Sequence, residues 1–148
     1  MAVKPIPDGY HTVTPYLTVK GADRLLDFVK NAFSAEETVR MDRPDGTIAH
    51  SEVQIGDSKV MLGEPTEQWD ESSATMHLYV EDCEATYRRA LDAGATSLQE
   101  PADQFYGDRM AGVRDPHGNN WWIATHIEDV PEDEMARRAE EWDRQQQS

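Results

Sequence analysis

The chain has 148 residues, 38% of them hydrophobic, which suffices for one compact domain with a core. Its net charge of −15 disfavours contact with nucleic-acid phosphates and with anionic membrane surfaces. No apolar run approaches the roughly 20 residues of a membrane-spanning helix, the first residues lack the hydrophobic stretch of a secretory signal, and the single cysteine, Cys83, cannot form an internal disulfide, so we expect a cytoplasmic protein.

A repeat organises the sequence. The segment Thr-Pro-Tyr-Leu-Thr-Val from Thr14 and the segment Thr-Met-His-Leu-Tyr-Val from Thr75 place Val19 and Val80 at an offset of 61. Each segment alternates like a strand and then runs into a helical pattern. One supersecondary unit is therefore present twice, and neither copy alone would bury both faces of its sheet. We predict a paired, curved sheet around a shared hollow.

Module one is predicted over residues 12–65. Apolar residues at three- and four-residue intervals predict an amphipathic helix over Lys20–Ser34. Residues 66–74 are polar and without periodicity, so we interpret them as the linker to module two. The further strands of module one are predicted at about Glu37–Met41, Ile48–Ile55 and Lys59–Leu62.

Module two, predicted over residues 75–127, repeats this order. Its helix is expected at Asp82–Ala93, and the turn Asp115–Gly118 should be a tight hairpin in which Asp115 caps backbone amides. Residues 131–147 are typical of a surface helix, with Trp142 docked on a neighbouring surface. The later strands of module two are predicted near Thr96–Leu98, Met110–Val113 and Asn120–Thr125. The stretch Glu100–Asp108 is interpreted as a covering loop.

Strand alternation predicts which side chains face the hollow, because each helix must cover the apolar face of its sheet. A mixture of aromatic walls and few polar groups on the other face is typical of a small-molecule site. In module one the side chains on that face are Thr14, Tyr16, Thr18, His50, Glu52, Gln54 and Met61. In module two they are Thr75, His77, Tyr79, Trp122, Ala124 and His126.

Four segments carry a family resemblance. They are Thr14–Leu17, Tyr106–Arg109, Arg114–Asn119 and Ala124–His126. With the paired modules, they make residues 12–130 resemble the vicinal oxygen chelate superfamily of glyoxalase I, fosfomycin- and bleomycin-resistance proteins and extradiol dioxygenases, and most closely its glyoxalase-like, PhnB-like branch. The resemblance implies an α+β fold in which two tandem βαβββ modules form a cupped, mostly antiparallel eight-stranded sheet. It also implies a homodimer with a site inside each cup.

Metal-dependent members of that superfamily carry ligands on the first and last strand of each module. Carried over by register, these positions here are Thr14, Met61, Thr75 and Trp122. Thioether, indole and two hydroxyls do not form a ligand set for a divalent cation. The sequence therefore predicts no metal and no cofactor at these positions, and it disfavours the lyase, isomerase and dioxygenase chemistries of the superfamily.

Two alternatives remain at His50, Glu52 and His77. They form a two-histidine, one-carboxylate set that would suit a displaced divalent metal, or they act without metal as an acid and base. In the simpler interpretation they are polar residues that support one another or a bound ligand.

We favour a binding protein that holds a small, partly aromatic molecule, over a glyoxalase-like enzyme. Tyr106 is expected at the rim of the pocket. Arg109 is expected either to clamp an anionic ligand or to pair with Asp108 or Glu100. The sequence does not identify the ligand, nor does it say whether the modules exchange across a dimer. The predicted ligand-binding residues are Tyr16, His50, Glu52, Met61, His77, Tyr79, Tyr106, Arg109 and Trp122.

Overall fold

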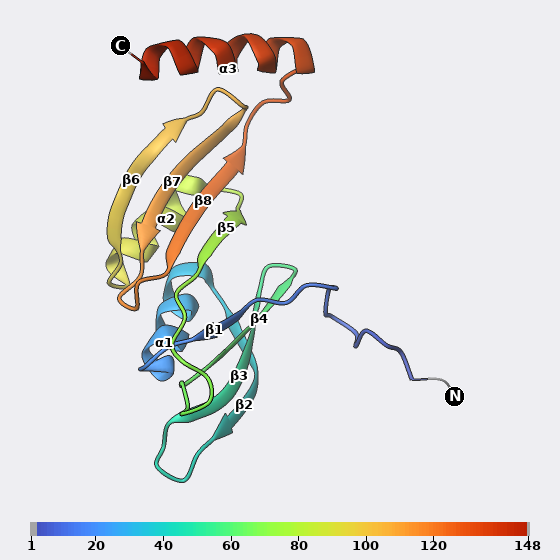
Figure 1. Cartoon of the computed structure of the whole chain (residues 1–148), viewed down its shortest axis with the longest axis vertical. Coiled ribbons are helices and arrows are strands. Elements are labelled where there is room, and N and C mark those ends of the chain that lie inside the picture. Colours follow the sequence, from blue (N-terminus) through green and yellow to red (C-terminus); the bar gives the residue numbers. More distant parts are fainter. Residues whose placement is uncertain (1–2, 148) are drawn as a thin grey trace.

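The computed structural model describes residues 3–147 and has an α+β fold, as the sequence predicts (Figure 1). Strands and helices alternate as two consecutive βαβββ modules, followed by one further helix. The elements are β1 (Tyr16–Thr18), α1 (Ala22–Phe33), β2 (Glu36–Asp42), β3 (Ile48–Ile55), β4 (Ser58–Gly63), β5 (Thr75–Tyr79), α2 (Cys83–Asp92), β6 (Thr96–Asp103), β7 (Asp108–Arg114), β8 (Asn120–His126) and α3 (Glu132–Gln146). Within residues 3–147, no helix is both long and apolar enough to cross a membrane.

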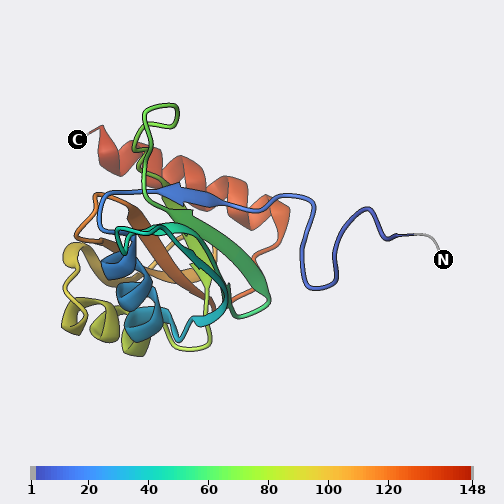
Figure 2. The ribbon, with the colours of Figure 1, turned by 90° about the horizontal axis from the view of Figure 1, so that it is seen from below.

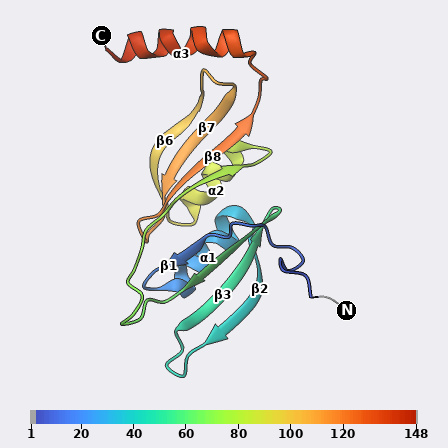
Figure 3. The ribbon, with the colours of Figure 1, turned by 45° about the vertical axis from the view of Figure 1, so that its right-hand side comes forward.

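The two modules have the same sheet topology. The strand orders are β1-β4-β3-β2 and β5-β8-β7-β6, and in each sheet only the edge pair, β1 with β4 or β5 with β8, is parallel. The eight strands are thus mostly antiparallel, but within the described part of one chain they form two separate four-stranded sheets rather than a continuous sheet of eight (Figure 3).

The helices and one buried aromatic pair join the modules. Helices α1 and α2 lie side by side (Figure 2). Leu25 and Val29 of α1 are fully buried because the apolar stripe of that helix packs on the sheets. At the end of α1, the ring of Phe33 lies 4.8 Å from the ring of Trp121 on β8, centroid to centroid. The hydrophobic core is therefore continuous from one module to the other.

The turn before β8 has the structural role that the sequence predicts. Asp115 Oδ1 accepts hydrogen bonds from the backbone N–H groups of His117 at 2.8 Å and Asn119 at 3.1 Å. Asp115 Oδ2 accepts from the Asn119 amide and from the Trp121 indole, both at 2.9 Å. This buried carboxylate therefore shapes the turn and also fixes the indole of the central core residue.

The expected covering loop over Glu100–Asp108 is wrong in its first half. Strand β6 continues to Asp103, and β7 begins already at Asp108. Pro101 suggests a strand end, but β6 is the outer strand of its sheet, where a residue without an N–H group interrupts no central hydrogen-bond ladder. Register shifts on both sides of Gln99 accommodate the irregular strand.

The final helix lies beyond the ends of β6 and β7 (Figure 1). No residue of α3 (Glu132–Gln146) is buried, so it is a helix on the surface. Arg138 donates to the carbonyl oxygen of Phe105 at 3.1 Å and to both carboxylate oxygens of Glu128. The ring of Trp142 lies 5.9 Å from that of Phe105, so Trp142 is docked on the β6–β7 turn.

Candidate functional site

A row of neighbouring side chains crosses the sheet of module one. Tyr16 on β1 pairs with Met61 on β4, and Met61 pairs with Glu52 on β3. His50 lies two residues before Glu52, on the same face of β3. Four of the predicted ligand-binding residues are therefore brought together on one face.

Hydrogen bonds connect three of these residues into a chain. Tyr16 Oη lies 3.0 Å from His50 Nδ1, and His50 Nε2 lies 2.7 Å from Glu52 Oε2. The other carboxylate oxygen of Glu52 accepts a hydrogen bond from the hydroxyl of Tyr10. Tyr10 precedes the first strand and the sequence gives no strand or helix pattern there, so sequence reasoning missed it.

The charge state of this chain follows from its contacts. The hydrogen bond from Tyr10 lowers the pKa of the Glu52 carboxyl, burial opposes that shift, and the contact with His50 lowers it further. Burial raises the pKa of Tyr16, with a smaller opposing effect of Arg43. At neutral pH this face therefore carries an ionised carboxylate behind a neutral phenol.

The equivalent row of module two has different chemistry. At the offset of 61, His77 pairs with Trp122, and Trp122 pairs with Gly112 on β7. A Cβ atom added to Gly112 would lie 2.2 and 2.5 Å from Cζ3 and Cε3 of Trp122. The indole thus lies directly over the glycine, in the place where module one has the side chain of Glu52.

A second hydrogen-bond network lies at the other end of this face. Tyr79 Oη donates to Asp108 Oδ2 at 2.8 Å, and His126 Nδ1 lies 2.8 Å from Asp108 Oδ1. His126 Nε2 lies 2.7 Å from Asp129 Oδ1. The hydrogen bonds to Asp108 and then Asp129 raise the pKa of His126, and the hydrogen bond to Asp108 raises the pKa of Tyr79. The sequence shows Asp108 only as a possible partner of Arg109, so this network was missed.

A cavity of about 1260 Å³ lies between the two modules. The segment before β1, the β3–β4 turn, β5 and the start of α2 contribute to its wall. Among the predicted ligand-binding residues, His77 and Tyr79 line it, and their rings lie 5.0 Å apart. The Tyr16–His50–Glu52 chain lies outside this lining. The predicted residues are therefore divided between an open sheet face and a cavity.

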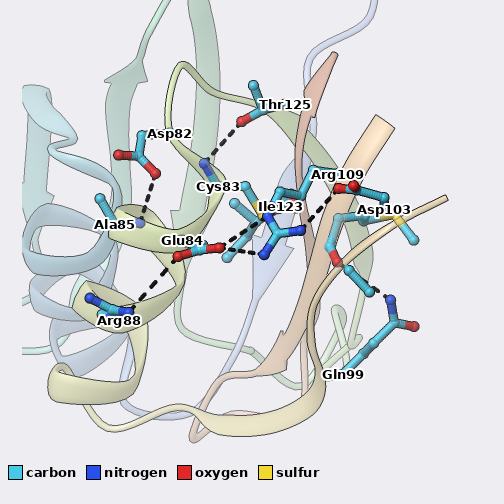
Figure 4. Close-up of polar contacts among 12 residues, drawn as sticks. Asp82, Cys83, Glu84, Ala85, Arg88, Gln99, Asp103, Arg109, Ile123 and Thr125 are labelled. Carbon is cyan, nitrogen blue, oxygen red and sulfur yellow. Dashed lines mark hydrogen bonds and ion pairs between the residues drawn. The ribbon is translucent and has the colours of Figure 1, made fainter. Parts of the chain in front are cut away.

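Arg109 points to the helix side of the sheet, where it pairs with two carboxylates other than the expected ones (Figure 4). Its Nε and Nη2 donate to Glu84 on α2, the first at 3.0 Å, and its Nη1 donates to Asp103 at 2.9 Å. Successive residues of a strand point to opposite faces, so Asp108 occupies the hollow side and Arg109 does not. Its partners are therefore neither Asp108 nor Glu100.

Tyr106 lies in the β6–β7 turn. Its hydroxyl is 3.5 Å from Met110 Sδ, and its ring is 5.2 Å from that of Phe105. It is not part of the wall of the cavity between the modules. Its place beside the α3 contact is a packing position.

The four positions that the family resemblance assigns to metal ligands carry side chains that do not suit a metal ion. Met61 and Trp122 lie on the sheet faces described above, Thr14 lines the cavity, and Thr75 begins β5. A thioether, an indole and two hydroxyls are unsuitable donors for a divalent cation. The ring of Trp122 moreover fills the space above Gly112.

The displaced set is not assembled either. His50 and Glu52 lie on β3 and bond to each other, whereas His77 lies on β5 in the other sheet. Within residues 3–147, no three His, Cys, Asp or Glu side chains are grouped so as to hold a metal ion.

The paired modules with open sheet faces define the class of protein. The family model of the glyoxalase/bleomycin resistance protein/dioxygenase superfamily matches residues 10–123, and the chain belongs to this superfamily. Uncharacterized protein Rv0887c of Mycobacterium tuberculosis strain H37Rv is 34% identical over 134 residues, which cover 83% of this chain and 79% of that protein. Uncharacterized protein Mb0911c of Mycobacterium bovis has the same identity, with 83% and 88% covered.

Solved structures show the same fold. TioX from Micromonospora sp. ML1 matches with a TM-score of 0.69 and 24% identity, covering 79% of this chain and 99% of TioX. TnmS3, an antibiotic binding protein from Streptomyces sp. CB03234, matches with a TM-score of 0.63 and 19% identity, covering 85% and 98%. At these identities the likeness concerns the fold.

Proposed function

We propose that the protein binds a small, partly aromatic molecule and uses no metal at the family ligand positions. One observation carries the proposal: the indole of Trp122 stands at such a position, with Gly112 making room for it. A large aromatic surface favours stacking and apolar contact, whereas a Lewis-acid site needs nitrogen, oxygen or thiolate donors.

The aromatic side chains near the candidate site support this proposal. Tyr16 is 47% exposed and Tyr79 is 64% exposed, so both rings are accessible to a ligand. That TnmS3, with the same fold, is an antibiotic binding protein makes sequestration or resistance a natural role to test. We further propose a cytoplasmic homodimer of the PhnB-like branch, in which a second copy covers these open faces.

An enzyme is the second candidate, and the Tyr16–His50–Glu52 chain favours it. A carboxylate that orients an imidazole, which in turn contacts a hydroxyl, is an arrangement that supports proton transfer. Glu52 itself is a poor general base, because its pKa is lowered and Tyr10 and His50 occupy both oxygens. In this alternative, the hydroxyl proton of Tyr16 would pass to His50 during the reaction and return afterwards.

A thermal-shift screen of aromatic antibiotics and α-keto compounds tests the proposal. A true ligand raises the melting temperature in proportion to the logarithm of its concentration. We expect aromatic compounds to bind. Trp122→Ala should lower their affinity at least about tenfold, since stacked aromatic contacts and their buried area contribute on the order of 1.5 kcal/mol or more.

Trp142→Ala is the matched control, because Trp142 lies on α3 against Phe105. It should leave the affinity unchanged. Hits among α-keto compounds that are consumed during the assay, together with no aromatic hits, would favour the enzyme instead.

A further inference from the structure

The hydrogen bonds around His50 fix the direction in which Tyr16 donates its proton. Both oxygens of Glu52 accept hydrogen bonds, and the lowered pKa keeps this carboxyl ionised, so it has no proton to donate. The proton between Glu52 and His50 must therefore belong to His50 Nε2. In the neutral ring, Nδ1 then carries only a lone pair.

Tyr16 is consequently the donor toward His50. Its only hydroxyl proton points to Nδ1 at 3.0 Å. The phenol oxygen is left with lone pairs alone on its exposed side. Any group that contacts this oxygen from the open face must supply the proton of the hydrogen bond.

Tyr79 has the same polarity through a different set of residues. Its hydroxyl donates to Asp108 at 2.8 Å, and His126 occupies the other oxygen of that carboxylate. The oxygen of Tyr79 therefore also offers only lone pairs to the cavity that it lines. Both exposed tyrosines of the candidate site are thus hydrogen-bond acceptors, each with a carboxylate behind it.

The nearby cations donate their hydrogen bonds to groups other than the two tyrosine oxygens. Arg89, which lines the same cavity as Tyr79, donates to Thr86 at 3.2 Å. Arg43 donates to Thr47 at 3.4 Å and to the carbonyl oxygen of Glu64 at 3.3 Å. Lys59 lies 5.4 Å from the ring centre of Tyr10 and donates to Thr38. Arg109 is held on the helix side of its sheet.

We propose that the ligand is an uncharged or cationic aromatic molecule that donates a hydrogen bond, from a hydroxyl or an N–H group, to the oxygen of Tyr16 or of Tyr79. This inference rests on the proposed function and adds the chemical class of the ligand. Methyl ethers of the same ring systems, which offer only acceptors, should bind more weakly.

The polarity can be tested without a ligand. Nitrogen-15 NMR of the histidine rings at about pH 8, where an ordinary imidazole is neutral, should place the His50 proton on Nε2, with Nδ1 shifted as a hydrogen-bond acceptor. His50→Gln assigns the signals. Tyr16→Phe should move the Nδ1 signal toward that of a free lone pair. A proton on Nδ1 would overturn the inference.

The ligand class is tested with a matched pair of probes, a hydroxynaphthalene and its methyl ether, by calorimetry on the full chain. We expect the hydroxyl compound to bind about tenfold more tightly, because a neutral hydrogen bond and the cost of leaving the tyrosine oxygen without a donor are of that size. The double variant Tyr16→Phe with Tyr79→Phe should abolish the difference.

Tyr87→Phe is the control for the loss of a tyrosine hydroxyl, because that hydroxyl donates to Ser97 at 2.7 Å, outside both networks. It should keep the tenfold preference. Equal binding of the two probes, or a preference that survives the double variant, refutes the ligand class while the proposed binding function stands. If no aromatic compound binds in either assay, the proposed function and this inference both fail.

Discussion

Replacing Gly112 by alanine should change stability with a sign that depends on Trp122. The new Cβ would lie 2.2 Å from Cζ3 of Trp122, and ordinary contact begins at 3.4 Å, so the indole must move by at least 1.2 Å. Overpacking of this kind costs about 1–3 kcal/mol. Alanine loses less conformational entropy on folding than a strand glycine does, which stabilises the folded state by only about 0.5–1 kcal/mol. We therefore expect Gly112→Ala alone to lower the free energy of unfolding by about 1–2 kcal/mol.

In the Trp122→Ala background the clash is gone. The same substitution should then be neutral or stabilise by up to about 1 kcal/mol, since only the glycine term remains. Urea unfolding of the four proteins in this double-mutant cycle measures the coupling, expected at about 1–3 kcal/mol. If the effects of the two substitutions on the free energy of unfolding are additive, Gly112 is not required to make room for the indole of Trp122.

Three further predictions concern Asp115 in the turn before β8, His126 in the second hydrogen-bond network, and Arg109. Asp115→Ala should destabilise by about 3–5 kcal/mol in urea unfolding, because four buried or partly buried donors lose their acceptor; a loss below about 1 kcal/mol would show that water replaces it. The contacts with Asp108 and Asp129 raise the pKa of His126 above its ordinary value of 6.5, so their stabilising effect is fully present below that value and is lost as the pH rises through the folded-state pKa; NMR titration should show this shift, and His126→Gln should flatten the pH dependence of stability in that window. Arg109→Ala should change the free energy of unfolding little and leave ligand affinity unchanged, because its ion pairs are partly exposed on the helix side; a selective loss of affinity for anionic ligands would show that Arg109 binds them.

Periodicity predicted most of the elements, and the family resemblance predicted how they are arranged. The offset between Val19 and Val80 predicted the duplicated module, and the same offset relates Met61 to Trp122 in the sheet registers. Alternation correctly buried Trp121 and left Trp122 on the other face, because the pleat permits only these two directions. The end of β6 was missed, since Pro101 interrupts a strand only where its N–H group would be needed.

The site was predictable in part. Alternation grouped Tyr16, His50 and Glu52 on one face, and the structure adds their hydrogen bonds. The contribution of Tyr10 depends on the path of an irregular segment, for which no periodic rule exists. The direction of Arg109 was not predicted, because β7 begins at Asp108, two residues before the predicted strand Met110–Val113, so alternation was not applied to Arg109.

The metal content of the purified protein tests the central claim most directly. After incubation with excess divalent zinc, nickel or manganese and dialysis, elemental analysis should find well below one equivalent of metal per chain, because Thr14, Met61, Thr75 and Trp122 are unsuitable ligands. The thermal shift produced by an aromatic ligand should be the same with and without a chelator. One tightly held equivalent per chain, lost together with catalytic activity on His77→Ala, would contradict the account.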